Sequence, residues 1–241
     1  MADSVPAFNN RILRSLAPDD LAMLRPQLQR VDLPVRSTLF EANAAIENVY
    51  FMESGFASVV ARTHAGASLE VGIIGREGMV GVPVLLGQRR SPHECYIQIA
   101  GDGYVMRADE LWSAMTKSWA LADVLLAFAY TFLVQVTHSA LANGRFTIEQ
   151  RLARWLLMAN DRLDGNDIQL THEFLSMMLG IRRPGVTAAL HTLEGLLAIK
   201  SIRGHVIVRD RSLLEKIAGD CYGMPESELT EVGLAPNNTA R

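Results

Sequence analysis

The sequence predicts an α+β protein with an N-terminal jelly-roll-like β-roll, one long helix and a C-terminal winged helix-turn-helix. Three observations carry this prediction. Residues 31–108 alternate short apolar runs with Gly, Pro, Asn and Asp, as a many-stranded antiparallel roll does. Residues 120–136 form the most apolar stretch, at helical length. Residues 171–197 place two amphipathic patterns on either side of Gly180, the spacing of a helix-turn-helix.

Length and composition are typical of a soluble globular chain. The 241 residues suffice for two modest domains, and 49% of them are hydrophobic while 20% are charged. The first ten residues lack a basic region followed by an apolar run, so we expect no secretory signal. Two distant cysteines, Cys95 and Cys221, argue against a disulfide framework and favour a cytoplasmic location.

The charge distribution favours a DNA-binding segment in the last third of the chain. The formal net charge of the whole chain is −3, yet residues 145–218 carry 11 Lys and Arg against 8 Asp and Glu, and the remainder is acidic. An ordinary solvated surface explains an excess this small equally well.

The elements follow in order along the chain. Residues 1–30 are expected to be helical, with Asn10 or Ser15 as a cap. Strands follow, then helix over 109–145, broken by a hinge at Asn143-Gly144. The tail shows little periodicity and is expected to be partly mobile. The predicted parts are a sensor domain over 1–118, a dimerisation helix and hinge over 119–145, a winged helix-turn-helix over 146–220 and a tail over 221–241.

The apolar segment 120–136 has three interpretations. A membrane span needs about 20 apolar residues, and this run is shorter and contains Asp123. A helix buried against a partner chain is favoured, because several side chains recur at 3–4 spacing as in a coiled-coil seam. An ordinary core helix remains open. The seam would comprise Leu121, Leu125, Phe128, Phe132, Gln135, Ser139 and Ala142.

The sequence of the C-terminal third predicts a compact DNA-binding domain. A helix over 147–163 begins at a possible Thr147 cap, and an extended piece follows at 167–170. Thr171 caps a short helix that ends at Gly180, where glycine supplies the left-handed conformation that redirects the chain. The next helix is expected over 181–197, with Pro184 in its first turn. Its buried face would comprise Val186, Ala189, Leu190, Leu193 and Leu197.

The exposed face of this second helix is the predicted base reader. Arg183 is the first choice for a bidentate contact to guanine, and Arg182, about 100° away, is assigned to a phosphate. The helix N-terminus at Thr171 and His172 is also assigned to phosphate, because its free N–H groups attract anions. The remaining interface residues are Gly185, Thr187 and His191.

The segment 198–210 predicts a hairpin with its turn at Arg203-Gly204. A basic hairpin beside a helix-turn-helix is a wing, so Lys200, Arg203 and His205 are candidates for backbone contacts. A purely structural hairpin is an open alternative. Asp210 is expected to cap a last helix over 211–218.

The chain resembles the Crp/Fnr family of bacterial regulators. The resemblance covers about residues 10–218 and is most specific in VYFMESGFASVV, EVGIIGREGMVGVPVLLG and LTHEFLSMMLGIRRPGVTAALHTLEG. It implies a transcription regulator that binds double-stranded DNA as a symmetric homodimer on a near-palindromic operator, often with contact to RNA polymerase. Pro184 and Ala188 depart from the cyclic-AMP-responsive members, so we expect a different operator half-site.

The resemblance also implies an effector pocket in the roll, although its signal is not identified. Cyclic-nucleotide binders of the family carry Gly-Glu where this chain has Gly81-Val82, so the carboxylate for the ribose is missing. Glu94 would repel a cyclic phosphate, and Arg90-Ser91 lies a few residues early. A cyclic-nucleotide-responsive regulator therefore remains an alternative. On the long helix, Thr137 and His138 complete the candidate pocket.

Other chemistries find little support in the sequence, and no cofactor can be named. An iron–sulfur cluster needs about four cysteine ligands, and the chain has two. No metal site is expected, and a haem ligand among His64, His93, Cys95 and His138 is disfavoured. We expect no enzyme, because phosphate-loop and nucleophile-elbow motifs are absent and Ser176 stands where a zinc protease needs its second histidine. A sensor that signals through protein contacts alone is the other alternative.

Overall fold

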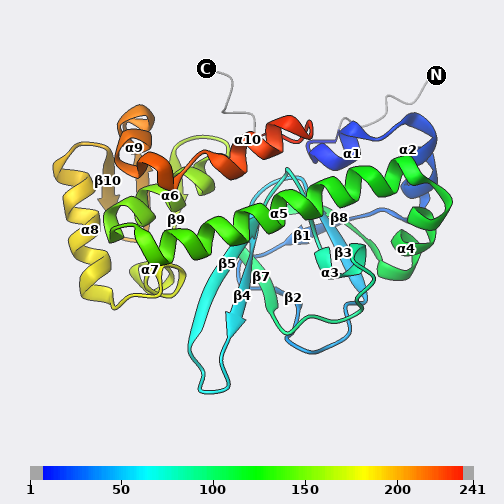
Figure 1. Cartoon of the computed structure of the whole chain (residues 1–241), viewed down its shortest axis with the longest axis horizontal. Helices are drawn as coiled ribbons and strands as arrows, with labels where there is room; N and C mark the ends of the chain where they lie inside the picture. Colours follow the sequence, from blue (N-terminus) through cyan, green and yellow to red (C-terminus); the bar gives the residue numbers. More distant parts are fainter. Residues whose placement is uncertain (1–7, 236–241) are drawn as a thin grey trace. The chain divides into compact units, whose positions relative to one another are not determined.

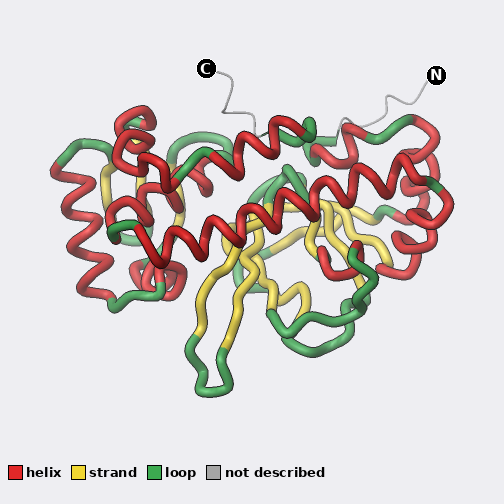
Figure 2. Tube along the Cα trace, viewed as in Figure 1, coloured by secondary structure: helices red, strands yellow, loops and turns green. Residues whose placement is uncertain are grey.

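The computed structural model describes residues 8–235 (Figure 1). By their contacts these residues form two compact units. One comprises 8–57, 74–130 and 231–234, and the other comprises 58–73, 131–230 and 235. The mixed α/β character predicted from the sequence is confirmed by the helices and strands of the structure (Figure 2). Most strands belong to the first half of the chain.

Helix was predicted over residues 1–30, of which 1–7 lie outside the described part of the chain, and over residues 8–30 the helical structure is more broken than predicted. Pro18 begins a new helix, and the first strand already starts at Gln29. Asn10 caps the first helix by accepting a hydrogen bond from the backbone N–H of Leu13 at 3.1 Å. The elements are α1 (Arg11–Ser15), α2 (Pro18–Leu24) and the 3₁₀ turn η1 (Arg25–Gln27).

The predicted roll consists of two antiparallel sheets. One has the strand order β1-β8-β3-β6 and the other β2-β7-β4-β5. Their strands are β1 (Gln29–Leu33), β2 (Thr38–Phe40), β3 (Asn48–Met52), β4 (Phe56–Arg62), β5 (Ser68–Ile74), β6 (Met79–Val80), β7 (Glu94–Ile99) and β8 (Gly101–Arg107). The sequence did not predict the two-residue β6 or the short helix α3 (Val82–Leu85) that follows it.

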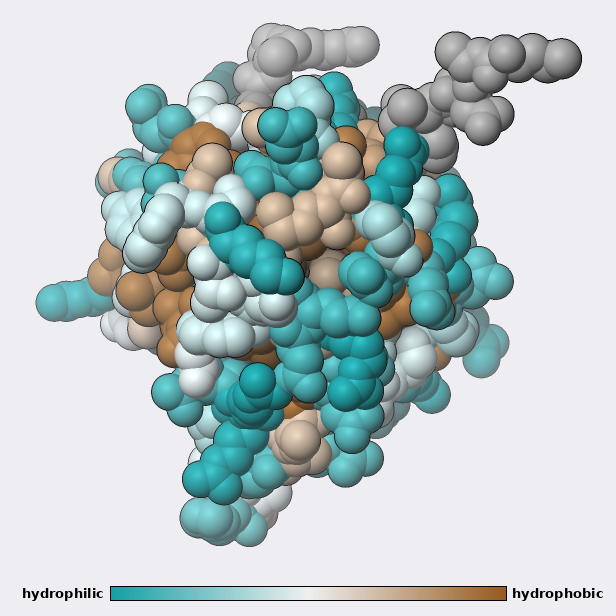
Figure 3. Space-filling model, turned by 90° about the vertical axis from the view of Figure 1, so that its right-hand side faces the viewer, coloured by the Kyte–Doolittle hydropathy of each residue, from teal (hydrophilic) through white to brown (hydrophobic). Residues whose placement is uncertain are grey.

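Two helices follow the roll, α4 (Ala108–Lys117) and α5 (Trp119–Arg145). The predicted break at Asn143-Gly144 was wrong, because α5 continues through both residues. Helix α5 is long and apolar enough to cross a membrane by length and composition, a criterion that the core helix of a soluble protein also meets. Figure 3 shows one face of the molecule, on which hydrophobic patches lie among hydrophilic side chains.

The predicted seam of α5 was wrong. Leu121, Leu125 and Phe128 are at most 2% exposed, so the chain itself covers them. Glycines allow this cover: a Cβ at Gly78 would overlap the Phe128 ring, and a Cβ at Gly72 would lie 2.8 Å from the Phe132 ring. Apart from Ala120, Leu141, Asn143 and Arg145, the exposed positions of α5 follow another stripe, again at 3–4 spacing: Trp119, Asp123, Leu126, Tyr130, Leu133, Thr137, Ala140 and Gly144. We call this set the exposed stripe.

The second unit holds the predicted helix-turn-helix elements. A capping box between Thr147 and Gln150 begins α6. A three-stranded sheet of order β10-β11-β9 accompanies the helices. The elements are α6 (Ile148–Asn160), β9 (Asp167–Gln169), α7 (His172–Leu179), α8 (Arg183–Gly195), β10 (Ile199–Ile202), β11 (His205–Val208) and α9 (Arg211–Ala218).

The segment after residue 220, where the sequence shows little periodicity, contains regular structure. The 3₁₀ turn η2 (Gly219–Cys221) leads into helix α10 (Met224–Glu231). Three of its residues, Pro225, Glu226 and Leu229, are buried, so tertiary contacts order a helix that the sequence pattern does not predict. Residues 236–241 of the tail lie outside the described part of the chain.

Candidate nucleic-acid interface

Helices α7 and α8 are joined by the tight turn that the sequence predicts. The Thr171 hydroxyl accepts a hydrogen bond from the Phe174 N–H at 3.3 Å and so caps α7. Gly180 has a φ of 62°, a left-handed conformation that favours glycine, and it ends α7. Helix α8 begins after Arg182, two residues later than predicted, with Pro184 in its first turn.

The apolar face of α8 is packed against the rest of its unit. Val186, Ala189, Leu190 and Leu193 are at most 2% exposed, and α8 contacts α6 and α7. Leu197 does not belong to this face, because it is 75% exposed and has a positive φ of 64° beyond the helix end. The buried face fixes which side of α8 is left for a ligand.

The exposed face of α8 carries most of the predicted DNA-binding side chains (α8 is yellow in Figure 1). Arg182, Arg183 and His191 are exposed, whereas Gly185 and Thr187 are half-buried. The Thr187 hydroxyl donates to the Arg183 carbonyl at 3.1 Å, so its donor is engaged within its own helix. Thr171 is exposed at the start of α7, and the side chain of His172 lies outside what the structure describes.

Arg183 forms an ion pair that the sequence did not predict. Its Nη2 lies 3.2 Å from Oε1 of Glu173, a residue of the first turn of α7. Both side chains are largely exposed, at 64% and 75%. The pair orients the guanidinium of the first residue of α8, and the ten-residue separation of its partners gives no local sequence signal.

The predicted wing is a hairpin of β10 and β11 that pairs with β9. Lys200 and Arg203 are exposed, and the turn lies at Arg203-Gly204 as predicted. The ring of His205 is half-buried, and its Nδ1 lies 3.0 Å from the Asp167 carboxylate. Of the three candidate residues, His205 is therefore already engaged within the hairpin sheet.

The candidate effector residues lie on several elements. Gly81, with a φ of 111°, precedes α3, and Val82 is buried at its start. Arg90 is exposed, while Ser91 is buried and accepts a hydrogen bond from the His93 N–H at 3.1 Å.

The remaining sensor candidates lie elsewhere or have other roles. On α5, Thr137 is exposed and donates to the Val134 carbonyl, and His138 is half-buried. Burial raises the pKa of the Cys95 thiol, which disfavours the thiolate that a metal would need. Within residues 8–235, no group of three His, Cys, Asp or Glu side chains is arranged to hold a metal ion.

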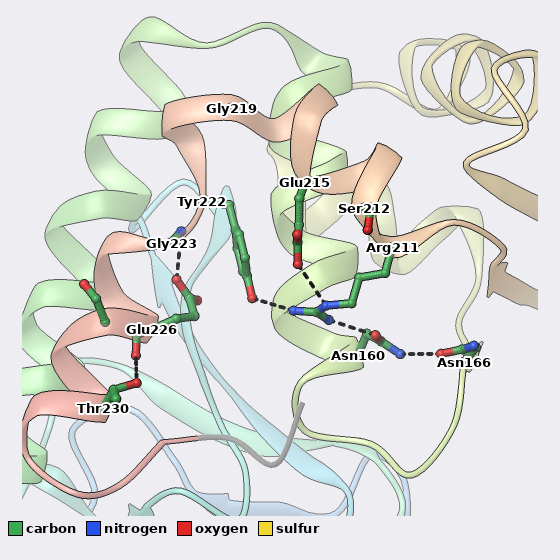
Figure 4. A pocket seen from close by; sticks show the side chains of 11 residues that line it. Asn160, Asn166, Arg211, Ser212, Glu215, Gly219, Tyr222, Gly223, Glu226 and Thr230 are labelled. Carbon is green, nitrogen blue, oxygen red and sulfur yellow. Dashed lines mark hydrogen bonds and ion pairs between the residues drawn. The ribbon is translucent and has the colours of Figure 1, made fainter. Parts of the chain in front are cut away.

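A polar network ties the C-terminal segment to α6 and α9 (Figure 4). Arg211 donates to Asn160 at 2.9 Å, to the buried Asp161 at 2.7 Å and to the Tyr222 hydroxyl at 2.9 Å. Burial would lower the pKa of Arg211, but the negative charge of Asp161 raises it above its usual range. The open pocket beside this network has a volume of about 760 Å³, and Arg211 is already committed to its own neighbours.

Comparisons with known proteins agree with this geometry. Residues 150–217 match the family model of the Crp-like helix-turn-helix domain. No curated protein sequence matches the chain.

Solved structures resemble the chain over most of its length. A transcriptional regulator assigned to the Crp/Fnr family from Eubacterium rectale has a TM-score of 0.68 at 16% identity, covering 87% of this chain and 98% of that one. FixK2 from Bradyrhizobium japonicum has a TM-score of 0.63 at 16% identity, covering 80% and 98%. The c-di-GMP-responsive regulator CLP of Xanthomonas campestris has a TM-score of 0.62 at 15% identity, covering 80% and 99%. The chain therefore carries a Crp-like helix-turn-helix domain within the fold of Crp/Fnr-family transcription regulators.

Proposed function

We propose that this chain is a sequence-specific DNA-binding transcription regulator of Crp/Fnr type. The observation that carries the proposal is the exposed first turn of α8, where Arg182 and Arg183 follow the glycine turn of a Crp-like helix-turn-helix. The N-terminal residues of a recognition helix are those that reach base edges in the major groove. Arg183 reads guanine, and Arg182 and Thr171 bind phosphates beside it.

The regulator acts as a homodimer on a near-palindromic operator. The exposed stripe of α5 supports this proposal, because its large apolar members Leu126, Tyr130 and Leu133 are 41–59% exposed. A stripe of this kind at 3–4 spacing is suited to a two-helix seam. A second copy would cover this stripe and place two recognition helices on the two half-sites.

The remaining roles follow from the same assignment. The protein works in the cytoplasm without enzymatic activity, contacts RNA polymerase and responds to an unidentified signal in the roll. The domain division at residues 118, 145 and 220 belongs to this proposal. The proposal also includes the operator. Its sequence differs from the operators of the cyclic-AMP-responsive relatives, because Pro184 and Ala188 stand on α8.

The test is the loss of sequence-specific binding in Arg183→Ala. An operator is first selected from random duplexes with the full-length protein. Removing one bidentate contact costs about 1–3 kcal/mol, so operator affinity falls roughly 5- to 150-fold while non-specific affinity falls much less. Arg182→Ala is the matched control, since a lost phosphate contact weakens binding to all sequences alike. An unchanged footprint for Arg183→Ala overturns the reading role.

A further inference from the structure

A buried carboxyl group links hairpin β4–β5 to helix α6. Glu70 lies on β5, and its Oε2 accepts a hydrogen bond from the hydroxyl of Ser58 on β4. Its Oε1 accepts a hydrogen bond from the indole Nε1 of Trp155 on α6 at 2.7 Å. All three side chains are buried and belong to the second unit. The hairpin thus holds a helix of the Crp-like domain through one carboxyl group.

Residues beside Glu70 hold the same hairpin. Gln135 of α5 accepts a hydrogen bond from the Ile73 N–H at 2.7 Å and donates to the Ile73 carbonyl at 3.1 Å. The side chain of Leu69 approaches the turn between α7 and α8 so closely that a Cβ at Gly180 would lie 2.9 Å from its Cδ1. The hairpin therefore contacts both α6 and the turn that precedes the recognition helix.

The Glu70 carboxyl group changes between its protonated and its ionised form near neutral pH. Burial raises the pKa of Glu70 to about 7, although the Ser58 and Trp155 hydrogen bonds, the charge of Arg154 on α6 and that of Arg162 just beyond the end of α6 act to lower it.

Other ionisable groups and a small cavity lie near the Glu70 carboxyl group. Glu226 of α10 and Cys221 act on Arg154, and α5 contributes the neutral hydroxyl of Ser139 at 3.2 Å from Arg154 Nη2. A cavity of about 30 Å³ beside Glu70 has room for roughly one water molecule, through which a proton can exchange.

We propose that Glu70 is a proton-dependent latch between the hairpin and α6. The carboxylate takes up one proton from solvent when hairpin β4–β5 docks on α6, and it returns that proton when the hairpin leaves. Solution pH then sets how firmly the hairpin holds the helix-turn-helix. The consequence for DNA binding rests on the proposed function, whereas the latch itself does not.

The direction of the effect follows from linkage. The released hairpin exposes Glu70 to water, where a glutamate has a pKa of about 4.5, well below its value in the docked state. Docking is therefore strongest at low pH and weakens as pH rises through about 7. Between these two pKa values the docking equilibrium changes by up to about tenfold per pH unit.

Trp155 reports on this latch directly. The chain has three tryptophans, so Trp112→Phe with Trp119→Phe leaves Trp155 as the single fluorophore. We expect its emission to titrate between pH 5.5 and 8.5 with a midpoint near 7, without DNA present. Glu70→Gln, which mimics the protonated acid, abolishes the titration. Ser58→Ala raises its midpoint, because the lost hydrogen bond no longer favours the carboxylate.

Two controls separate Glu70 from other ionisable groups. Glu226→Gln removes another buried carboxyl group and His138→Gln removes a histidine of α5, and both retain the Trp155 titration. Hydrogen exchange of residues 58–73, corrected for the intrinsic pH effect, speeds up at pH 8 in the wild type and not in Glu70→Gln. An emission that does not titrate, or that titrates equally in Glu70→Gln, overturns the latch.

DNA binding forms a separate arm of the test. Affinity for the selected operator differs between pH 6 and pH 8 in the wild type, and this difference shrinks in Glu70→Gln. If no DNA is bound at either pH, the fluorescence titration still decides the latch, and the proposed function alone fails. If DNA affinity keeps the same pH dependence in Glu70→Gln, the latch does not regulate DNA binding.

Discussion

At the scale of single residues, the ion pair between Arg183 and Glu173 distinguishes α8, the proposed recognition helix. A carboxylate beside a DNA-binding face opposes the approach of phosphates, so it lowers general affinity. It can compensate by holding the guanidinium in one direction, since the ion pair of 3.2 Å joins α7 to the first residue of α8. Because both side chains are exposed, the pair adds little to stability. We therefore expect the ion pair to affect the choice of DNA sequence rather than the stability of the fold.

Glu173→Gln should therefore lower specificity without lowering affinity for DNA in general. Non-specific binding becomes equal or tighter because a negative charge is lost, while discrimination at the guanine read by Arg183 falls several-fold. The measurement is the ratio of operator to non-operator affinity at fixed salt.

Glu231→Gln removes the same charge from α10, outside the helix-turn-helix, and should leave that ratio unchanged. In a double-mutant cycle, Glu173→Gln should have little effect once Arg183 is alanine. Equal loss of specificity with and without Arg183 would contradict the positioning role.

Residues whose role is local could be predicted from the sequence. Asn10, Thr147, Thr171 and Asp210 all cap helices, because a cap depends on residues within one turn. Glu70 could not be predicted, because its partner Trp155 lies 85 residues away along the chain. The same limit applies to Glu173, whose partner belongs to another helix.

At the scale of elements, α5 shows why an apolar helix is hard to orient from its sequence. Apolar residues recur at 3–4 spacing on more than one of its faces, so periodicity alone cannot say which face meets the roll. Gly72 and Gly78 show which face of α5 is buried, because the lack of a Cβ lets the rings of Phe132 and Phe128 approach them closely. The exposed stripe is the face of α5 that a partner chain can contact.

Leu133→Glu should convert the protein to a monomer, since a charge in a helix seam stays unpaired when two copies meet. Leu133 is 59% exposed in the single chain, so the monomer keeps its fold and its circular dichroism. Light scattering measures the mass.

Leu86→Glu is the matched control, because Leu86 is equally exposed at 60% and lies outside the exposed stripe. The control should keep the mass of the parent protein. A dimeric mass for Leu133→Glu, or a monomeric mass for the parent, contradicts the proposed seam.

At the scale of the whole molecule, the buried carboxyl groups with raised pKa values gather in one unit. Glu70, Asp161 and Glu226 all lie in the unit that holds the helix-turn-helix, and burial raises the pKa of each. A carboxyl group that is easier to protonate in the folded state binds more protons there than in the unfolded chain. This stabilisation is full below the unfolded pKa and is lost as pH rises through the folded pKa.

The free energy of unfolding should therefore fall between pH 6 and pH 8, by about 1 kcal/mol from Glu70 alone. Urea unfolding followed through Trp155 emission measures it, at one protein concentration because a dimer unfolds in a concentration-dependent way. Glu70→Gln should flatten the pH dependence by about that amount, and Glu231→Gln, at an exposed site, should not. An equal slope in Glu70→Gln would mean that the docked hairpin does not hold the carboxyl group in its buried, proton-binding state. In that case Glu70 would not pass a pH change from the hairpin to α8.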